Sequence, residues 1–117
     1  MIVKATREGL LGRPTSTGWI INNNVPFVAL PSRAALGLWV RVTNPNNGES
    51  IKALVLDIGP WNTNDDKYVF GGERPQAESG TDTRGRTTNK AGIDLGELVW
   101  NYLGMKDNTE VDWEFIN

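Results

Sequence analysis

The sequence predicts an all-β fold, a small barrel with one or two short helices and a long inserted loop. Thirteen Gly and six Pro among 117 residues favour a turn-rich β protein over a helical bundle. Residues 38–57 have the pattern of a β-hairpin, and apolar residues recur at helical spacing over residues 95–103. The length fits one domain with one core, so we expect residues 1–117 to form a single domain.

The hairpin is the clearest unit. Apolar and other side chains alternate from Leu38 to Thr43, which is the period of a strand. The Asn47-Gly48 pair that follows favours a tight turn because both residues tolerate positive φ. The return strand, roughly residues 49–57, is apolar at every position from 53 to 56, as in a strand buried on both faces. It ends abruptly at Asp57, which is followed by a Gly-Pro turn and Trp61.

The other elements are shorter. We expect strands near residues 2–6 and 19–21, a helical turn over residues 31–37, and a final strand that contains residues 111–116. Asp94 with Glu97 three residues later matches a capping box, so we expect a helix that starts there and ends at Gly104. Residues 58 to 92 show little periodicity. A loop of this length in a compact domain is usually functional or disordered.

Composition excludes several function classes. A net charge of −2 lacks the basic excess that nucleic-acid binding needs. The chain has no Cys and no His, so thiol nucleophiles, imidazole bases and the usual zinc sites are excluded. Acid-base chemistry then falls to carboxylates, with Lys or Tyr as less favoured candidates. We expect no cofactor, no nucleic acid and no membrane partner. We find no signal-peptide pattern at the start, and the sequence does not predict a localisation.

Residues 62–73 partly match a calcium-binding loop. Asn62, Asn64, Asp66 and Glu73 fall at positions 1, 3, 5 and 12 of that template. However, Lys67 stands where the loop needs Gly, and the flanks are not helical. We therefore expect no metal site, and the charges of the 62–90 loop suggest a solvated surface or a contact for a partner protein.

Three segments resemble the double-psi β-barrel domains of rare lipoprotein A, expansins and family 45 endoglucanases. They are TSTGW at 15–19, WVRVTNPNNGESIKALVLDIGPW at 39–61 and AGIDLGELVWNYLGM at 91–105. Together they cover about half the chain. The resemblance implies a six-stranded double-psi barrel with a groove across one face, and activity on peptidoglycan or another β-linked glycan at the cell wall or in the periplasm.

The resemblance also implies site residues. Asp57 falls on the aspartate of the family's D-x-G-P motif, and Asp94 falls on the aspartate of its I-D-L motif, which is the general acid in family 45 hydrolases. The chain departs from the family at two positions: Trp19 replaces a glutamate, and Pro31 aligns with a histidine. Partial burial is expected to raise the pKa of Asp57 toward that of a general acid.

Sugar contacts are expected from aromatic and polar residues near these acids. The candidates are Trp61, Trp19, Tyr68, Asn62 and Thr43. The other three tryptophans, Trp39, Trp100 and Trp113, lie at positions whose periodicity predicts burial.

Three functions remain open from the sequence. The first is a lytic transglycosylase-like enzyme that cleaves β-1,4 bonds with Asp57 and Asp94 as acid and base. The second is a non-catalytic glycan-binding, expansin-like module, and the third is a structural component of a phage or secretion assembly. The two aspartates also have a purely structural interpretation, in which Asp57 accepts backbone hydrogen bonds at a turn and Asp94 caps the helix.

Overall fold

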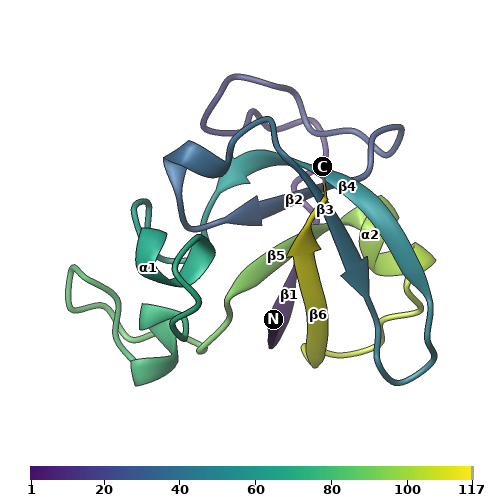
Figure 1. Ribbon diagram of the computed structural model, residues 1–117. Coiled ribbons are helices and arrows are strands. Elements are labelled where there is room, and N and C mark those ends of the chain that lie inside the picture. The colour runs from purple at the N-terminus through teal and green to yellow at the C-terminus, as the bar shows by residue number, and fades with distance from the viewer. Residues whose placement is uncertain (117) are drawn as a thin grey trace.

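The computed structural model describes residues 1–116 and contains a closed six-stranded barrel (Figure 1). The pairing order is β1-β5-β2-β4-β3-β6, with β6 returning to β1. The β1–β5 and β2–β4 pairs are parallel, and the other four are antiparallel. The strands are β1 (Ile2–Glu8), β2 (Phe27–Leu30), β3 (Trp39–Thr43), β4 (Ser50–Ile58), β5 (Ile93–Gly96) and β6 (Glu110–Phe115). The predicted all-β barrel is confirmed.

The helices are short, and one predicted boundary is wrong. The structure contains η1 (Arg33–Ala35), α1 (Asp66–Val69), η2 (Gln76–Ser79) and α2 (Glu97–Tyr102). Asp94 does not cap α2, because it lies inside β5 with Thr6 on one side and Ala29 on the other; Gly96 is the N-cap. The strand expected at residues 19–21 is reduced to one isolated bridge between Pro14 and Ile20.

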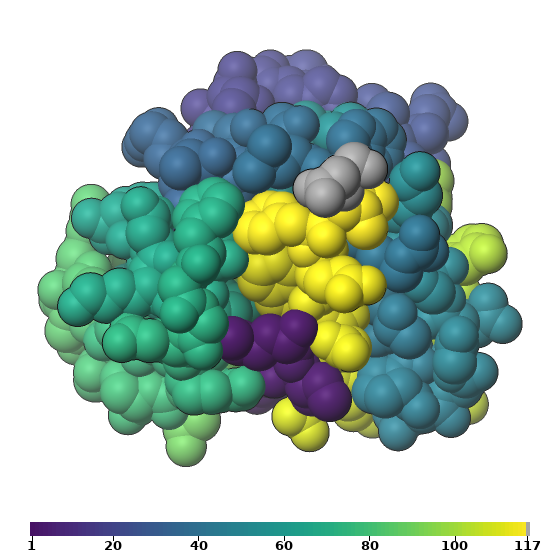
Figure 2. All heavy atoms as spheres, in the orientation of Figure 1, coloured from purple at the N-terminus to yellow at the C-terminus, as the bar shows by residue number. Residues whose placement is uncertain are grey.

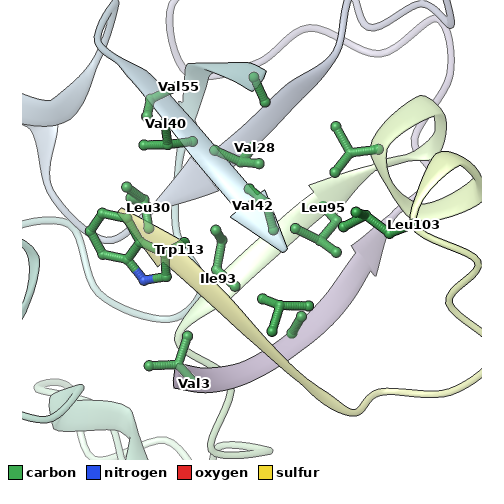
Figure 3. Packing of buried hydrophobic residues seen from close by; sticks show 14 of the residues in the cluster. Val3, Val28, Leu30, Val40, Val42, Val55, Ile93, Leu95, Leu103 and Trp113 are labelled. Atoms are coloured by element: carbon green, nitrogen blue, oxygen red, sulfur yellow. The ribbon is translucent and has the colours of Figure 1, made fainter. Parts of the chain in front are cut away.

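The barrel interior is filled by aliphatic side chains (Figure 3). Trp100 and Trp113 are buried as predicted. Trp39 is 44% exposed, so its predicted burial is wrong: the alternation of β3 turns Val40 and Val42 inward and leaves position 39 on the outer face. The core residues labelled in the figure are Val3, Val28, Leu30, Val40, Val42, Val55, Ile93, Leu95, Leu103 and Trp113.

A β-bulge in β4 decides where Asp57 points. Ala53 and Val55 face the core, so strict alternation would also turn Asp57 inward. The register with β2 shifts at this point: Val28 lies opposite Val55, whereas the next residue, Ala29, lies opposite Asp57. Leu56 is therefore the extra residue of a bulge, and Asp57 joins Ala29 on the outer face of the barrel wall.

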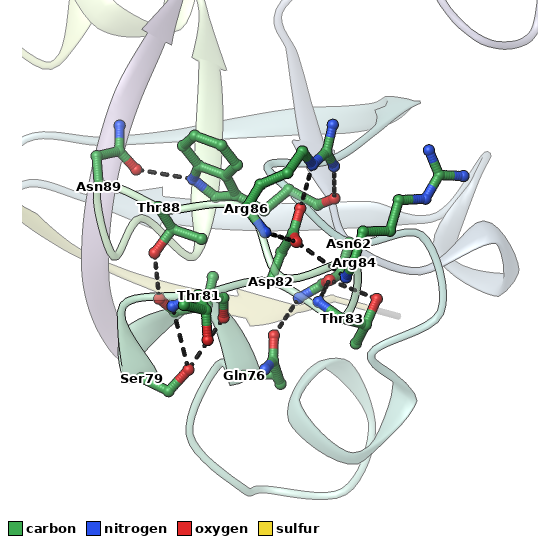
Figure 4. Close-up of polar contacts among 12 residues, drawn as sticks. Asn62, Gln76, Ser79, Thr81, Asp82, Thr83, Arg84, Arg86, Thr88 and Asn89 are labelled. Atoms are coloured by element: carbon green, nitrogen blue, oxygen red, sulfur yellow. Dashed lines mark hydrogen bonds and ion pairs between the residues drawn. The ribbon is translucent and has the colours of Figure 1, made fainter.

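Residues 59–92 form a lobe packed against the barrel (Figures 1 and 2). Two buried polar side chains organise it (Figure 4). The Asn62 amide nitrogen donates to Gln76, and its oxygen accepts from the backbone and hydroxyl of Thr83. The Asp82 carboxylate accepts from the Arg86 guanidinium at 2.6 Å and from backbone amides of the turn that follows it. The loop expected from the sequence is thus an ordered unit with its own polar centre.

Gly96 allows the close packing of β5 against β2. A Cβ at this position would lie 2.4 Å from a ring carbon of Phe27. We predict that Gly96→Ala lowers the free energy of unfolding by about 1–3 kcal/mol, because a methyl group must be accommodated where the ring lies. Urea denaturation measures the change.

Gly9→Ala is the matched control for this prediction. Its Cβ would meet the ends of the Glu97 and Arg7 side chains, at 3.3 and 3.9 Å, and both side chains can move. Its effect is expected to be within about 0.5 kcal/mol. Equal effects of the two substitutions would contradict the proposed role of Gly96.

Candidate functional site

The strand register places Asp94 and Asp57 in one row across the outer face of the barrel wall. Asp94 pairs with Thr6 on β1 and with Ala29 on β2, and Ala29 in turn pairs with Asp57 on β4. Two strand spacings separate the aspartate backbones, about 9.5 Å. The small residue Ala29 lies between them. The structure therefore brings the two predicted acids together on one face.

Asp57 is held ionised by its contacts. Its Oδ1 accepts hydrogen bonds from the backbone amides of Ser16 at 3.0 Å and Ile58 at 2.9 Å. Burial acts to raise the pKa of this carboxyl, but hydrogen bonds from Glu8, Ser16 and Ile58 outweigh it and leave the pKa below its usual range. The predicted increase is therefore wrong in sign. The backbone contacts expected of a structural aspartate are present, and they also tie the 9–24 loop to β4.

Glu8 is a third acid of the site that the sequence analysis missed. It ends β1, and its Oε2 is buried without a hydrogen-bond donor among the described residues. Burial is the main cause that raises its pKa to about 9, with a hydrogen bond to Asp57 and the charges of Asp57 and Asp94 adding to it. A neutral Glu8 can donate a hydrogen bond to the Asp57 carboxylate. This bond gives the buried Glu8 oxygen an acceptor and the Asp57 carboxylate a further donor. An acid at the end of a strand, just before Gly9, was the available signal, since Asp57 also lies near the end of its strand, two residues before Gly59.

Asp94 has the properties of a proton donor near neutral pH. Burial raises its pKa to about 6, the charge of Asp57 adds to this, and a hydrogen bond from the Thr6 hydroxyl opposes it. Gly59 lies close by, since a Cβ on that residue would be 3.7 Å from Asp94 Oδ2. The turn after β4 thus passes beside the Asp94 carboxyl.

The lobe holds Trp61 on one side of the acid row. Its indole N–H donates to Asn89 Oδ1 at 2.8 Å, and its carbonyl accepts from Arg86 at 3.1 Å. The Asn89 carbonyl accepts from Lys4, two residues before Thr6 on the same face of β1. Trp61 also has φ of 70°, a conformation that bulky residues rarely adopt and that is often found at functional sites.

Trp19 lies on the other side of the row. Its ring packs edge-on against Phe27, with 5.0 Å between the centroids. Phe27 covers Gly96, two residues beyond Asp94 along β5. Both indoles are partly exposed. The acids are thus flanked by an aromatic side chain on each side along the direction of β5.

Three of the predicted sugar contacts do not fit their positions. Tyr68 is 1% exposed and bonds to Gly92 and Trp113 in the core. Asn62 is 2% exposed and uses its amide inside the lobe. Thr43 lies opposite Ser50, at the end of β4 remote from Asp57. These residues support the fold, and we do not assign them to ligand contact.

The site thus contains three carboxyls with different protonation states: Asp57 and Asp94 in the row, and Glu8 two residues beyond Thr6 on β1. Asp57 is ionised, the pKa of Asp94 is about 6, and Glu8 is neutral. Two acids whose environments push their pKa values apart are the arrangement that acid-base cleavage of a glycosidic bond requires.

No helix among residues 1–116 is long and apolar enough to cross a membrane.

The closed six-stranded barrel defines the class of protein, a double-psi β-barrel, and this fold is shared with solved structures of a cerato-platanin and an expansin. Residues 1–114 match the family model described as a domain of unknown function, DUF8814, and the chain belongs to that family.

Relatives in sequence and structure agree with this class. The chain is 31% identical over 110 residues to the endolytic peptidoglycan transglycosylase RlpA of Yersinia pestis, covering 94% of this chain and 23% of that protein. The match to cerato-platanin 3 from M. perniciosa covers all of this chain and 95% of the cerato-platanin chain, with a TM-score of 0.59 and 9% identity. The match to an expansin of Clavibacter michiganensis solved with cellohexaose covers all of this chain and 51% of the expansin chain, with a TM-score of 0.54 and 15% identity. The chain spans less than a quarter of the RlpA relative.

The hydroxyl of Thr6 is predicted to set the pKa of Asp94. Thr6→Val keeps the shape of the side chain but removes the hydrogen bond that favours the ionised carboxyl, so the pKa of Asp94 should rise above 6. Titration of the carboxyl carbon by NMR measures the shift. An unchanged or lower pKa would show that the hydroxyl does not stabilise the charge.

Glu8 is predicted to make stability fall with increasing pH. Its pKa in the folded protein, about 9, is above the 4.5 of an unperturbed glutamate, so the folded state retains a proton that the unfolded chain releases between these values. The stabilisation is complete below about pH 4.5 and is lost as the pH rises through 9. We expect Glu8→Gln to flatten the decrease in melting temperature between pH 6 and 9. Parallel curves for the two proteins would contradict the assignment.

Proposed function

We propose that this protein cleaves the β-1,4 glycosidic bonds of peptidoglycan or a related cell-wall glycan, with Asp94 as general acid and Asp57 as general base. The observation that carries the proposal is the division of pKa values between two acids of one row: Asp94 is raised to about 6, and Asp57 is lowered. The RlpA relative, a peptidoglycan transglycosylase by name, supports the choice of substrate. The site of action is then the bacterial cell wall or periplasm.

The proposed reaction needs no water and no cofactor. Asp94 donates its proton to the glycosidic oxygen, and the bond between that oxygen and the anomeric carbon breaks. The 6-hydroxyl of the same muramyl residue attacks the anomeric carbon, and Asp57 accepts the hydroxyl proton. The products are a 1,6-anhydro sugar end and a free 4-hydroxyl. Transfer of the proton from Asp57 back to Asp94 restores the starting state.

The neighbours of the two acids support these roles. Two backbone amides and Glu8 stabilise the charge of Asp57, so it is ionised when Asp94 still holds a proton. Glu8 is assigned here as a positioning residue, because it acts on Asp57 by hydrogen bonding. Trp61 and Trp19 are the proposed stacking platforms, since the apolar faces of sugars pack against indole rings.

A non-catalytic glycan-binding module is the second candidate. The specific observation in its favour concerns two residues that the families resembled by this chain carry, a glutamate and a histidine. Trp19 and Pro31 stand in their places. The expansin solved with cellohexaose has the same fold. In this case, the aromatic platforms would bind the glycan and the acids would not cleave it.

Digestion of purified peptidoglycan distinguishes the candidates. We expect 1,6-anhydro products by mass spectrometry from the wild-type protein, and a loss of about a hundredfold or more in Asp57→Asn and Asp94→Asn. Asp112→Asn is the matched control, since Asp112 is an aspartate on β6 whose partner is the chain's own amino terminus. Binding without products supports the module, and neither binding nor products would leave a structural role in an assembly.

The rate is predicted to follow a bell-shaped pH profile. Activity should decrease above about pH 6 as Asp94 loses its proton, and decrease at acid pH as Asp57 becomes protonated. Initial rates between pH 3 and 8 measure both limbs. A rate that rises steadily through pH 8 would exclude Asp94 as the proton donor.

A further inference from the structure

A hollow lies on the Trp61 side of the acid row. Its volume is about 350 Å³, and its walls come from β1, the start of β6 and the 74–90 part of the lobe. Lys4, Lys90 and Arg74 contribute positive charges to it, and Glu78 and Glu110 contribute negative ones. None of the acids of the proposed cleavage site lines this hollow.

The charges of the hollow are not equally available. The Arg74 guanidinium is committed to Glu78 through two hydrogen bonds of 2.9 and 2.7 Å. Glu110 is the cross-strand neighbour of Lys4 in the β1–β6 pair. Lys90 is exposed and forms no ion pair with residues 1–116. The hollow therefore carries one net positive charge, and the Lys90 ammonium is the group free to bind an anion.

The position of Lys90 links the hollow to the sugar platform. The side chain of the preceding residue, Asn89, accepts a hydrogen bond from the Trp61 indole (Figure 4). The Asn89 carbonyl accepts a hydrogen bond from the Lys4 ammonium. Lys90 has φ of 69°, and its amide bonds to the Thr88 hydroxyl. The backbone segment that orients Trp61 thus also carries Lys90, so the indole ring and the hollow are connected through neighbouring residues.

We propose that this hollow binds a carboxylate carried by the glycan, with Lys90 as its principal partner and Lys4 as the second. The inference rests on the proposed function. An ammonium group on a flexible stem suits a carboxylate whose position varies along a chain. In peptidoglycan, this group is either the lactyl carboxylate of a muramic acid without peptide or a carboxylate of the attached peptide. The substrate class is then an acidic glycan, and a neutral chain lacks one contact.

The test compares three ligands in an Asp94→Asn background, which prevents cleavage. The ligands are peptide-bearing glycan chains, the same chains after amidase removal of the peptides, and neutral oligosaccharides of N-acetylglucosamine. Lys90→Gln is expected to weaken binding of the acidic glycan at least about threefold and to leave neutral binding unchanged. Weaker binding of the amidase-treated chains alone identifies the lactyl carboxylate, because peptide-bearing chains carry that group as an amide. Weaker binding of the peptide-bearing chains alone identifies a carboxylate of the peptide, and weaker binding of both shows that the hollow accepts either carboxylate.

Lys52→Gln is the matched control, because Lys52 is an exposed lysine of β4 whose cross-strand neighbour is Arg41. It should change none of the affinities. Equal weakening of neutral and acidic ligands by Lys90→Gln, or no weakening of either, overturns the carboxylate site while the proposed function stands. If the protein binds none of the three ligands, the proposed function fails and the carboxylate site fails with it. Thermal unfolding of each variant confirms that the fold is kept.

Discussion

The one-residue register shift at Leu56 is the constraint on which the site depends. The side chains of a strand alternate between two faces, so a strand that buries Ala53 and Val55 can present residue 57 on its outer face only by breaking the alternation. The bulge does this two residues before β4 ends at Ile58. Because β2 lies between β4 and β5, the same shift aligns Asp57 with Ala29 and hence with Asp94. The core packing and the acid row are thus two results of one backbone irregularity.

Three acids in one small region oppose folding, and the surrounding structure offsets this cost unequally. Asp57 receives two backbone amides and remains charged, whereas Glu8 receives no donor and remains neutral. Asp94 lies between these extremes because Thr6 gives it a single hydroxyl donor. All three acids are partly buried, and burial raises the pKa of each. The protonation pattern therefore follows from the number of hydrogen-bond donors that each acid has, since these donors stabilise the ionised form. The arrangement that favours acid-base chemistry is also one that limits stability at high pH.

The sequence predicts the barrel better than it predicts the site. The alternation over residues 38–57 and the Asn47-Gly48 pair are local signals, and the structure confirms the hairpin that they predict. Of the two turn residues, Gly48 has positive φ and Asn47 does not. The long-range neighbours of each acid are not encoded locally. Asp94 matches a helix cap by sequence, but its pairing with Thr6, 88 residues away, holds it in a strand. The pKa of Asp57 depends on hydrogen bonds from Glu8 and Ser16. The Tyr68 hydroxyl lies in the core, where it accepts a hydrogen bond from the Trp113 indole. No local pattern carries this information.

The bond between the Trp61 indole and Asn89 joins positions 28 residues apart, at the two ends of the lobe. The lobe therefore leaves and re-enters the barrel at nearly the same place, and its own contacts centre on Asp82 and Asn62. The entropy of closing a loop grows only slowly with its length. An insertion anchored in this way can lengthen, shorten or change its surface during evolution at little cost to the barrel, provided that its two ends still meet. The fold thus separates a structural requirement, the closed base of the lobe, from a lobe surface that can change independently of the barrel.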